Sequence, residues 1–403
     1  MINFNQKPLP ELNIGTVGHV DHGKTSLVQC LTGKWTDTHS EELKRGITIR
    51  IGYADSTFYK CQKCGAYGTS EKCPSCFGDA TAIRTVSFVD LPGHETLMAT
   101  VLSGSAILDG ALLVISANEK CPQPQTAEHV KTLDVVGIRN IIIVQTKVDI
   151  VDEERALKSY EEIKEFVHGT VAENAPIVPV SAIHCTNMDA LIAAIEKHIP
   201  TPKRSDGEPR FFIARSFDVN KPGTEIAKLS GGVIGGSVVS GIMRVGDEID
   251  IKPGVGTEKG WMPIKTKITA IIKSGQGVEE ARAGGLVALQ TDLDPAITRA
   301  DGLDGNIAGK NMPEVFDEIK IETDLFDHVV GIEGFQKVEP IRTNDALMLT
   351  VSIAKTVGRV TSARKNVCEI KLKLPVCTQK GDRVSLSKQI QGRWHLIGWC
   401  KII

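Results

Sequence analysis

The stretch Gly18-His19-Val20-Asp21-His22-Gly23-Lys24-Thr25 decides the fold of the first half of the chain, because it matches the pattern GxxxxGK[ST]. It directly follows an apolar run at 12–17, as expected of a strand that leads into a helix. Glycines allow such a turn to aim backbone N–H groups at phosphate oxygens, and the following helix adds the positive end of its dipole. The alternative is a turn that only joins two elements, but the motifs further along the chain argue against it.

Short apolar runs alternate with helix-like segments from this loop to about residue 199. Several runs are apolar at nearly every position, which is typical of parallel strands covered on both faces. This order predicts an α/β domain with a doubly wound, mostly parallel sheet. The predicted strands are 12–17, 86–89, 111–115, 141–144 and 177–180, and the predicted helices include 125–136 and 153–167.

The second half of the chain has a different pattern. A polar, proline-containing hinge at 200–207 precedes short strand-like runs that glycines interrupt at intervals typical of barrels. We therefore predict two all-β barrel domains after the α/β domain. The predicted boundaries give a first domain of residues 1–204, a second of 205–327 and a third of 328–403.

Composition limits the possible functions. The 403 residues carry a formal net charge of −2, so contact with a nucleic acid needs a local basic patch. The N-terminus lacks a signal-peptide core, and no later stretch approaches the roughly 18 apolar residues of a membrane helix. We therefore expect a cytoplasmic protein without a membrane partner.

The phosphate loop supplies the first candidate ligands. Lys24 is expected to reach the β- and γ-phosphates and to act in catalysis, and the Thr25 hydroxyl to ligate Mg²⁺. A carboxylate beside phosphates should be repelled, so Asp21 suggests a second cation between its side chain and the backbone near Gly46. The loop residues expected to contact the nucleotide are Asp21, His22, Gly23, Lys24, Thr25 and Ser26.

A second motif, Asp90-Leu91-Pro92-Gly93-His94, follows another predicted strand. Open α/β sheets bind ligands at the carboxyl ends of their strands, so Asp90 can hold a water of the Mg²⁺ shell. The Gly93 N–H can contact the γ-phosphate. Loss of that phosphate would break the contact and release the loop. His94 is the candidate for orienting the attacking water, and the alternative is a solvated loop histidine.

Thr48 lies in the segment Arg45-Gly46-Ile47-Thr48-Ile49. A loop threonine can complete the Mg²⁺ shell while the γ-phosphate holds the loop closed, which makes Thr48 a third catalytic candidate. The competing interpretation is an ordinary strand threonine, because two isoleucines flank it.

Two segments after later predicted strands are candidates for reading the base. Asp149 can accept hydrogen bonds from the N1–H and N2–H₂ groups that guanine has and adenine lacks, and the stem of Lys147 can cover the base plane. The segment Ser181-Ala182-Ile183 can offer backbone N–H groups to guanine O6. The ordered series of motifs at strand ends predicts a switch protein that binds GTP and GDP with Mg²⁺ and hydrolyses GTP.

Four of the ten cysteines form two CxxC pairs, Cys61/Cys64 and Cys73/Cys76, separated by eight residues. Two tight turns can present four thiolates to one ion, so we predict a Cys₄ Zn²⁺ site. Free thiols, a lost metal site and an iron–sulfur cluster are the alternatives. The segment at about 58–80 is therefore predicted to be a zinc knuckle inserted in the first domain, and metal binding should supply much of its folding free energy. The remaining cysteines are scattered, and the clustering favours metal binding over disulfides.

These motifs together resemble a known family. GHVDHGKT, RGITI, DLPGH and KVD are similar to the translational GTPases related to elongation factor Tu. The Cys₄ insert and four longer stretches more closely resemble the gamma subunit of archaeal and eukaryotic translation initiation factor 2. The resemblance runs from about Leu12 to Ile403, and the segment 40–45 looks more archaeal than eukaryotic. The longer stretches are 121–126, 215–223, 231–236 and 393–399.

The resemblance implies a GTPase domain followed by two β-barrels, in a subunit that joins an alpha and a beta partner. With GTP bound, such a factor delivers initiator methionyl-tRNA to the small ribosomal subunit, and hydrolysis stimulated by a GTPase-activating partner factor releases it. The chain departs from the family at Thr146, where the base-reading motif usually has Asn. Thr146 remains a candidate nucleotide contact, and nucleotide affinity or loop rigidity is expected to differ.

Three other functions compete with this one. An elongation-type carrier of aminoacyl-tRNA is one, although its selenocysteine-specific form usually has a longer chain. The GTPase subunit of a sulfate adenylyltransferase is not expected to have the Cys₄ insert. A GTP-sensing scaffold without hydrolysis conflicts with the intact set of Lys24, Thr25, Thr48, Asp90 and His94.

Overall fold

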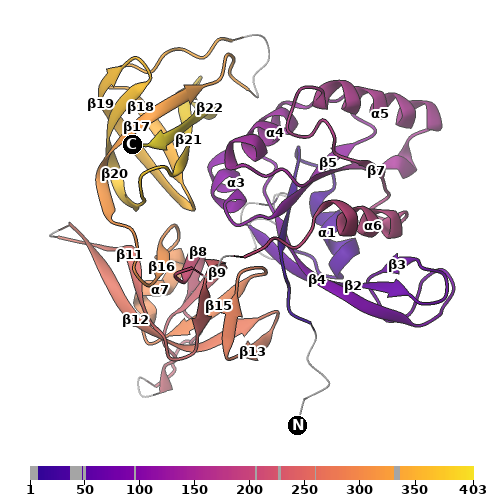
Figure 1. Cartoon of the computed structure of the whole chain (residues 1–403), viewed down its shortest axis with the longest axis horizontal. Coiled ribbons are helices and arrows are strands. Elements are labelled where there is room, and N and C mark those ends of the chain that lie inside the picture. The colour runs from indigo at the N-terminus through magenta and orange to yellow at the C-terminus, as the bar shows by residue number, and fades with distance from the viewer. Residues whose placement is uncertain are drawn as a thin grey trace.

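The first half of the chain is built on a seven-stranded sheet of order β3-β2-β4-β1-β5-β6-β7 (Figure 1). The computed structural model describes residues 8–36, 48, 51–94, 97–204, 207–225, 228–258, 260–330 and 336–403. The five strands from β4 to β7 in this order are parallel, and β2 and β3 add antiparallel pairings. The strands are β1 (Asn13–Val17), β2 (Gly52–Cys61), β3 (Tyr67–Gly68), β4 (Ala80–Asp90), β5 (Gly110–Ser116), β6 (Ile141–Thr146) and β7 (Ile177–Pro179).

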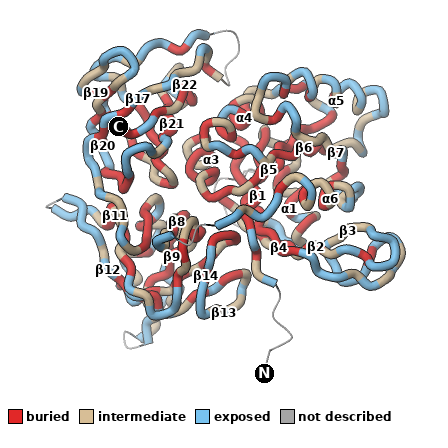
Figure 2. The backbone as a smooth tube through the Cα atoms, in the orientation of Figure 1, coloured by how far each residue is buried: buried red, intermediate tan, exposed pale blue. Residues whose placement is uncertain are grey.

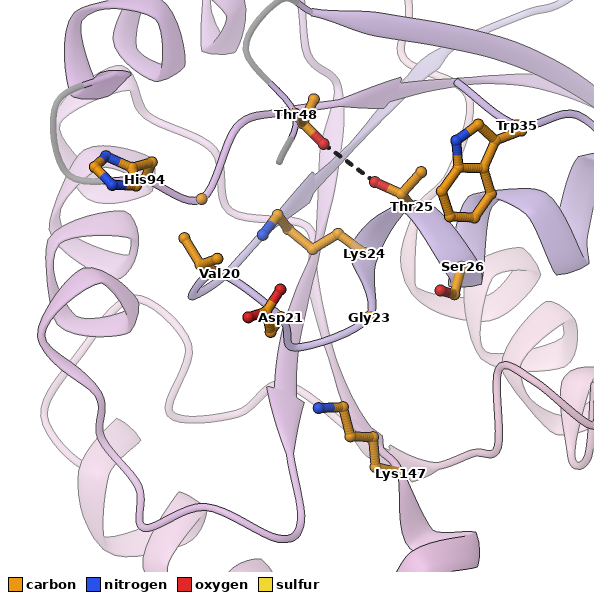
Figure 3. Close-up of a pocket in the computed structure, with 11 residues that line it drawn as sticks. Val20, Asp21, Gly23, Lys24, Thr25, Ser26, Trp35, Thr48, His94 and Lys147 are labelled. Carbon is orange, nitrogen blue, oxygen red and sulfur yellow. Dashed lines mark hydrogen bonds between the residues drawn. The ribbon is translucent and has the colours of Figure 1, made fainter. Parts of the chain in front are cut away.

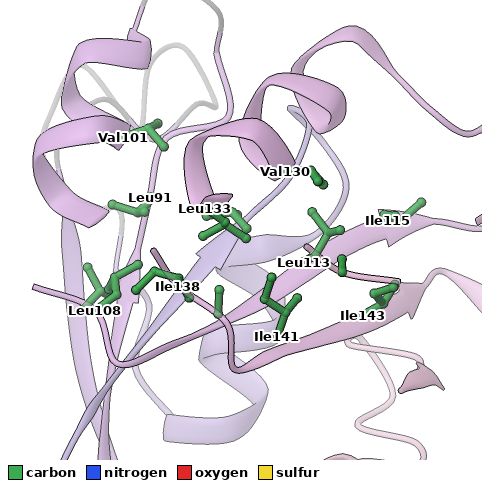
Figure 4. Close-up of a cluster of buried hydrophobic side chains, with 14 of the residues drawn as sticks. Leu91, Val101, Leu108, Leu113, Ile115, Val130, Leu133, Ile138, Ile141 and Ile143 are labelled. Carbon is green, nitrogen blue, oxygen red and sulfur yellow. The ribbon is translucent and has the colours of Figure 1, made fainter. Parts of the chain in front are cut away.

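Helices cover both faces of this sheet. Leu27 of α1 and Ile192 of α6 pack on one face. Val101 of α3 and Leu133 of α4 belong to the core on the other face (Figure 4), as does Ile163 of α5. Every residue of β5 is buried, as a strand with helices on both sides requires, so the doubly wound sheet is confirmed. The helices are α1 (Lys24–Thr32), α3 (Met98–Ser105), α4 (Pro124–Val136), α5 (Glu153–Val167) and α6 (Met188–His198).

The second unit is a ring of strands. Its sheet has the order β11-β16-β8-β9-β15-β12-β13, and the pairing of β11 with β12 closes the ring. The separate pair β10 and β14 lies beside it. The elements are β8 (Arg210–Phe217), β9 (Val233–Ser240), β10 (Ile242–Arg244), β11 (Glu248–Thr257), β12 (Gly260–Lys273), β13 (Gln276–Val278), β14 (Glu280–Arg282), β15 (Val287–Thr291), α7 (Pro295–Thr298), η4 (Arg299–Asp301) and β16 (Ile307–Gly309).

The third unit is a closed barrel of order β17-β20-β19-β18-β21-β22, so both predicted barrels are confirmed. Buried positions alternate along its strands and gather in the barrel interior (Figure 2). Its strands are β17 (Val315–Leu325), β18 (Ala346–Val351), β19 (Ala354–Arg364), β20 (Val367–Cys377), β21 (Arg383–Ile390) and β22 (Arg393–Ile402).

The strand pairing affects the proposed domain limits. β17 pairs with β20 and β22, so a boundary at 327/328 separates this strand from its own barrel. The alternating pattern of β17 identifies a strand but not its partners, which is why the sequence placed it one domain too early. We propose that the third domain begins between β16 and β17, and we keep 204/205 as the proposed first boundary.

Close contacts join the first unit to the second. The side-chain amide of Asn13, in β1, donates to the hydroxyl of Ser237, in β9, over 3.1 Å. A Cβ at Gly284 would lie 1.9 Å from the carbonyl oxygen of Glu11, so this close approach requires glycine. The backbone leading into β1 is therefore packed directly against the second unit.

Helix α4 joins the first unit to the third. The carboxylate of Glu128 lies 3.2 Å from Nδ1 of His395, in β22, and both side chains are buried. Leu102 and Val135 form a small apolar cluster with Leu396 of the barrel. A buried contact between Glu128 and His395 and an apolar cluster therefore fix the barrel against α3 and α4. No helix in the described part of the chain has the length and apolar character needed to span a membrane.

The apolar cluster yields a stability prediction. Leu396 is 1% exposed, so Leu396→Ala should lower the free energy of unfolding by about 2–5 kcal/mol through lost burial and a residual cavity. Leu374→Ala in the same barrel is the matched control, because Leu374 is 41% exposed and its loss should cost less than about 0.5 kcal/mol. Urea unfolding measures both. Equal effects would show that the cluster does not stabilise the interface.

Candidate nucleotide site and cysteine cluster

The phosphate loop connects β1 to α1 and lines a cavity of about 330 Å³ (Figure 3). Gly18 has φ 142°, and a Cβ there would lie 2.2 Å from the carbonyl oxygen of Val114. Gly23, with φ 87°, lies directly before the first residue of α1. Both glycines are thus required by the backbone path, and the N-terminus of α1 faces the cavity where an anion binds best.

His129 holds the loop from behind. This residue of α4 is fully buried, and its Nδ1 accepts a hydrogen bond of 2.7 Å from the Gly18 N–H. Burial lowers the pKa of His129 to about 3, and repulsion from Lys24 adds to the effect. The ring is therefore neutral at physiological pH, as an accepting nitrogen must be. No local motif indicates this role, because His129 lies 111 positions from Gly18.

Threonine hydroxyls surround the carboxylate of Asp90. Asp90 is fully buried at the end of β4, and its two oxygens accept hydrogen bonds from Thr16 at 2.7 Å and from Thr25 and Thr36 at 2.8 Å each. The hydroxyls of Thr25 and Thr48 lie 3.2 Å apart. Thr16 and Thr36 are contacts that the motifs did not predict. This group offers only oxygen atoms, the donors that Mg²⁺ prefers, so the residues fit the predicted ion.

Lys24 and Gly93 lie together at the cavity. The Lys24 ammonium donates to the carbonyl oxygens of Gly18 and His19 over 3.0 and 2.7 Å. A Cβ at Gly93 would lie 2.3 Å from Lys24 Nζ, so only glycine permits this approach. His94 lines the same cavity. The structure thus brings Lys24, Thr25, Thr48, Gly93 and His94 to one place, as the catalytic and phosphate-binding predictions require.

The remaining phosphate-loop candidates separate into two groups. Asp21, Gly23 and Ser26 line the cavity, and Asp21 is exposed with φ 60°. His22 is instead buried behind the loop, where its Nδ1 lies 3.1 Å from the carbonyl oxygen of Val114. Gly46 lies outside the described residues, so the second cation at Asp21 stays a prediction.

Thr146 connects the base-reading segment to the phosphate loop. Its buried hydroxyl donates to the carbonyl oxygen of His22 over 2.6 Å. Thr146, a shorter side chain than the Asn usual in this family, therefore ties the base-reading segment to the phosphate loop. Lys147, with φ 59°, follows directly and lines the cavity (Figure 3).

The other base-reading candidates lie past the ends of β6 and β7. Asp149 is exposed in the short helix η2 (Val148–Ile150). Ser181 is buried, whereas Ile183 is 77% exposed. These residues and Ala182 do not line the 330 Å³ cavity. Their contact with a base therefore remains a prediction supported by their position at neighbouring ends of parallel strands.

The four predicted zinc ligands form one cluster. The Sγ atoms of Cys61, Cys64, Cys73 and Cys76 all lie within 4.8 Å of one another. Three of the pairs, Cys61–Cys76, Cys64–Cys73 and Cys64–Cys76, are 3.5 Å apart. A tetrahedral ion with Zn–S bonds of about 2.3 Å needs sulfur atoms about 3.8 Å apart, so the cluster fits zinc.

Backbone groups favour the thiolate form of Cys61, one member of this cluster. The N–H groups of Lys63 and Cys64 point at Cys61 Sγ over 3.4 and 3.5 Å. The hydrogen bond from Cys64 is the main cause that lowers the pKa of the Cys61 thiol to about 6. A thiol that ionises readily is a better metal ligand.

Two of the cysteines outside this cluster form a disulfide. Cys30 of α1 is disulfide-bonded to Cys185, in the loop after β7. Their separation of 155 positions hides the pair from the sequence.

The neutral His129 yields a pH prediction. In the unfolded chain His129 takes up a proton near pH 6.5, but in the folded chain only near pH 3, so acidification favours unfolding. Between pH 7.5 and 5 this residue should cost about 2 kcal/mol of stability. His129→Gln retains an acceptor for Gly18 and should remove that part of the pH dependence in urea unfolding. His168→Gln, at an exposed histidine, is the control, and equal pH slopes in all three proteins would contradict the prediction.

The cysteine cluster yields a metal prediction. Purified protein should contain about one Zn²⁺ per chain, and Cys73→Ser should lose it because one tetrahedral ligand is missing. Mass spectrometry of the metal content measures this. Cys121→Ser, at a buried cysteine outside the cluster, should keep its metal. Full zinc occupancy in Cys73→Ser would contradict the assignment.

Three family models match successive parts of the chain. Residues 10–201 match the elongation factor Tu GTP binding domain, and residues 231–296 match elongation factor Tu domain 2. Residues 317–402 match the C-terminal domain of initiation factor eIF2 gamma. The first unit is therefore a translational GTPase domain.

Solved structures share the fold. A bacterial selenocysteine-specific elongation factor superposes with a TM-score of 0.74 at 26% identity, over 97% of this chain and 58% of that chain. Elongation factor SelB from Methanococcus maripaludis, in complex with the GTP analogue GppNHp, gives 0.72 at 22% identity over 98% of this chain and 80% of that one. This chain thus spans only part of each of those proteins.

The curated relatives align with this chain over nearly their whole length. Translation initiation factor 2 subunit gamma from Methanocaldococcus jannaschii is 53% identical, with 99% of each chain covered. The protein of the same name from Archaeoglobus fulgidus is 57% identical over 98% of this chain and 95% of its own. The chain therefore belongs to the archaeal gamma-subunit family of translation initiation factor 2, within the elongation-factor-Tu-like translational GTPases.

Proposed function

We propose that this chain binds initiator methionyl-tRNA in its GTP form, delivers it to the small ribosomal subunit in the cytoplasm, and releases it after GTP hydrolysis. The similarity to initiation factor 2 gamma subunits over 99% of both chains carries the proposal. Membership of that family also supports an assembly with alpha and beta subunits and hydrolysis stimulated by a GTPase-activating partner factor.

The geometry of the cavity supports the roles of the catalytic candidates. Lys24 at the N-terminus of α1 neutralises charge on the β- and γ-phosphates, and backbone N–H groups of the loop hold them. Thr25 and Thr48 would hold Mg²⁺, and Asp90 would hold a water of its shell; the ion would supply further charge neutralisation when bound. His94 orients the attacking water beside Gly93. Such positioning and charge stabilisation account for most catalysis in phosphoryl transfer.

A second cavity supports the aminoacyl-tRNA part of the proposal. It has a volume of about 390 Å³ and lies between β2 of the GTPase domain and the strands of the second unit. Phe217, Leu286 and Ala288 contribute to its apolar wall, and Tyr53 belongs to β2. Lys34, Asp55 and Arg215 also line this cavity, so it combines an apolar wall, which suits the thioether side chain of methionine, with charged groups. Because β2 begins shortly after Thr48, the wall of this chamber is linked to the nucleotide site.

The elongation-type carrier is the second candidate function, since the solved selenocysteine-specific factors share this fold. Two observations favour the initiation factor. The C-terminal barrel matches the eIF2 gamma model, and the chain is 53% identical to the gamma subunit from Methanocaldococcus jannaschii but 26% identical to the bacterial selenocysteine factor.

A tRNA-binding experiment distinguishes the two. The purified chain, with and without an alpha subunit, is titrated at one stated salt concentration with initiator methionyl-tRNA and with elongator aminoacyl-tRNAs, in GTP analogue or GDP. A preference for the initiator with the GTP analogue would establish the proposal. Equal binding of elongators would favour an elongation-type carrier, and binding of no tRNA would exclude both.

A variant in the second cavity tests where methionine lies. Ala288→Phe should fill part of the chamber and weaken binding of methionyl-tRNA by on the order of tenfold, without changing GDP affinity. Ala346→Phe adds the same ring at an exposed position in β18 and is the matched control. Unchanged binding in Ala288→Phe would place the methionyl group elsewhere.

A further inference from the structure

The disulfide between Cys30 and Cys185 joins helix α1, which borders the phosphate cavity, to the loop predicted to contact the base. Cys30 lies in α1, whose first residues, Lys24 and Thr25, line the phosphate cavity. Cys185 lies two positions after Ile183, in the loop predicted to contact the base. The Cα atoms of the two cysteines are 5.8 Å apart, within the range that a disulfide spans without backbone movement. The bond thus ties the element that holds phosphate to the loop that holds the base.

Hydrogen bonds within the loop are local by comparison. The Thr186 N–H donates to the carbonyl oxygen of Ser181 over 3.0 Å, and the His184 N–H reaches the Ser181 hydroxyl over 3.3 Å. The side-chain amide of Asn187 donates to the carbonyl oxygen of Pro179 over 2.7 Å. These bonds shape the loop and hold its base to β7. The disulfide is the covalent tie between this loop and α1.

The pair is also accessible to small reagents. Cys185 is exposed and Cys30 is partly exposed, whereas Cys121, Cys368, Cys377 and Cys400 are buried. Exposure favours exchange with small thiols and disulfides, because the attacking sulfur must reach the bond in line. Of these six cysteines, only Cys30 and Cys185 are both close to each other and accessible to small reagents.

We propose that Cys30 and Cys185 form a reversible redox modification site that controls nucleotide release. The disulfide holds the base loop against α1 and slows the opening through which the nucleotide leaves, and reduction frees the loop and speeds release. This inference rests on the nucleotide site proposed above and adds a regulatory input to it. Loop opening is the low-stability motion on which such control can act.

The exchange chemistry is balanced by a small disulfide as oxidant. The Cys185 thiolate attacks one sulfur of that disulfide, forms a mixed disulfide and expels one small thiolate. The Cys30 thiolate then attacks the Cys185 sulfur, forms the protein disulfide and expels the second small thiolate. Two electrons pass from the cysteine sulfurs to the small disulfide, and the two protons lost by the cysteines end on the released thiols. An excess of small thiol reverses both steps.

Release kinetics of a fluorescent GDP analogue test the proposal. The full chain is equilibrated in oxidised or reduced glutathione, loaded with the analogue and mixed with excess GDP. Wild type should release the analogue on the order of tenfold faster after reduction. Cys30→Ser and Cys185→Ser should release it at the fast rate in both buffers, and Cys368→Ser, at a buried cysteine of the third unit, should behave as wild type.

Each measurement of the release rate is accompanied by two controls on the same sample. Peptide mapping under non-reducing conditions shows whether the disulfide is present, and a metal assay gives the zinc content. A mapped Cys30–Cys185 bond with equal release rates in both buffers would overturn the inference while leaving the nucleotide site intact. A bond that never forms in the oxidising buffer would overturn it as well. A redox effect that persists in Cys185→Ser, or that follows loss of zinc, would assign the effect to other thiols. Failure of every form to retain the analogue would instead reject the proposed nucleotide site, and this inference with it.

Discussion

The hydrogen bond from the Gly18 N–H to the buried Nδ1 of His129 is the contact on which the nucleotide site depends most directly. It fixes the first residue of the phosphate loop from the side opposite the ligand, so the inward N–H groups keep their direction. The bond needs a neutral ring, and burial supplies that condition by lowering the pKa of His129. The Thr146 hydroxyl adds a second fixed point at the carbonyl oxygen of His22. Loop geometry is therefore set in part by two side chains, His129 and Thr146, that do not line the cavity.

Helix α4 carries this constraint to the rest of the molecule. Glu128, the residue before His129, meets His395 of the third unit in a buried contact. One helix thus contacts the phosphate loop with one side chain and the C-terminal barrel with its neighbour. The second unit is bound to the same domain through β1, where Asn13 contacts Ser237. The strand and the helix that position the phosphate loop are also the elements to which both barrels attach.

The sequence was most informative where function needs a fixed local pattern. The phosphate loop, the Asp90 motif and the paired cysteines are such patterns, and the structure brings Lys24, Asp90 and Thr25 together and gathers the cysteines into one cluster. The sequence could not reveal contacts between residues far apart in the chain. His129, Thr36 and the Cys30–Cys185 pair have no local signature, because each acquires its role only from tertiary packing. The same reason applies to the boundary predicted at 327/328, since alternation identified β17 as a strand without showing which barrel it closes.

The contact between α4 and the C-terminal barrel also determines how far the GTPase domain can be used as an independent module. A fragment cut after residue 204 would expose Leu102 and Val135, which are buried in the whole chain, and would separate Glu128 from His395. Newly exposed apolar surface promotes self-association, and a carboxylate that has lost its buried partner favours rearrangement of the surrounding helix. Chimaeras that combine domains of different proteins should therefore keep the GTPase domain together with the barrel face that covers α4. The α4 surface of the GTPase domain and the barrel face that covers it therefore form one structural unit.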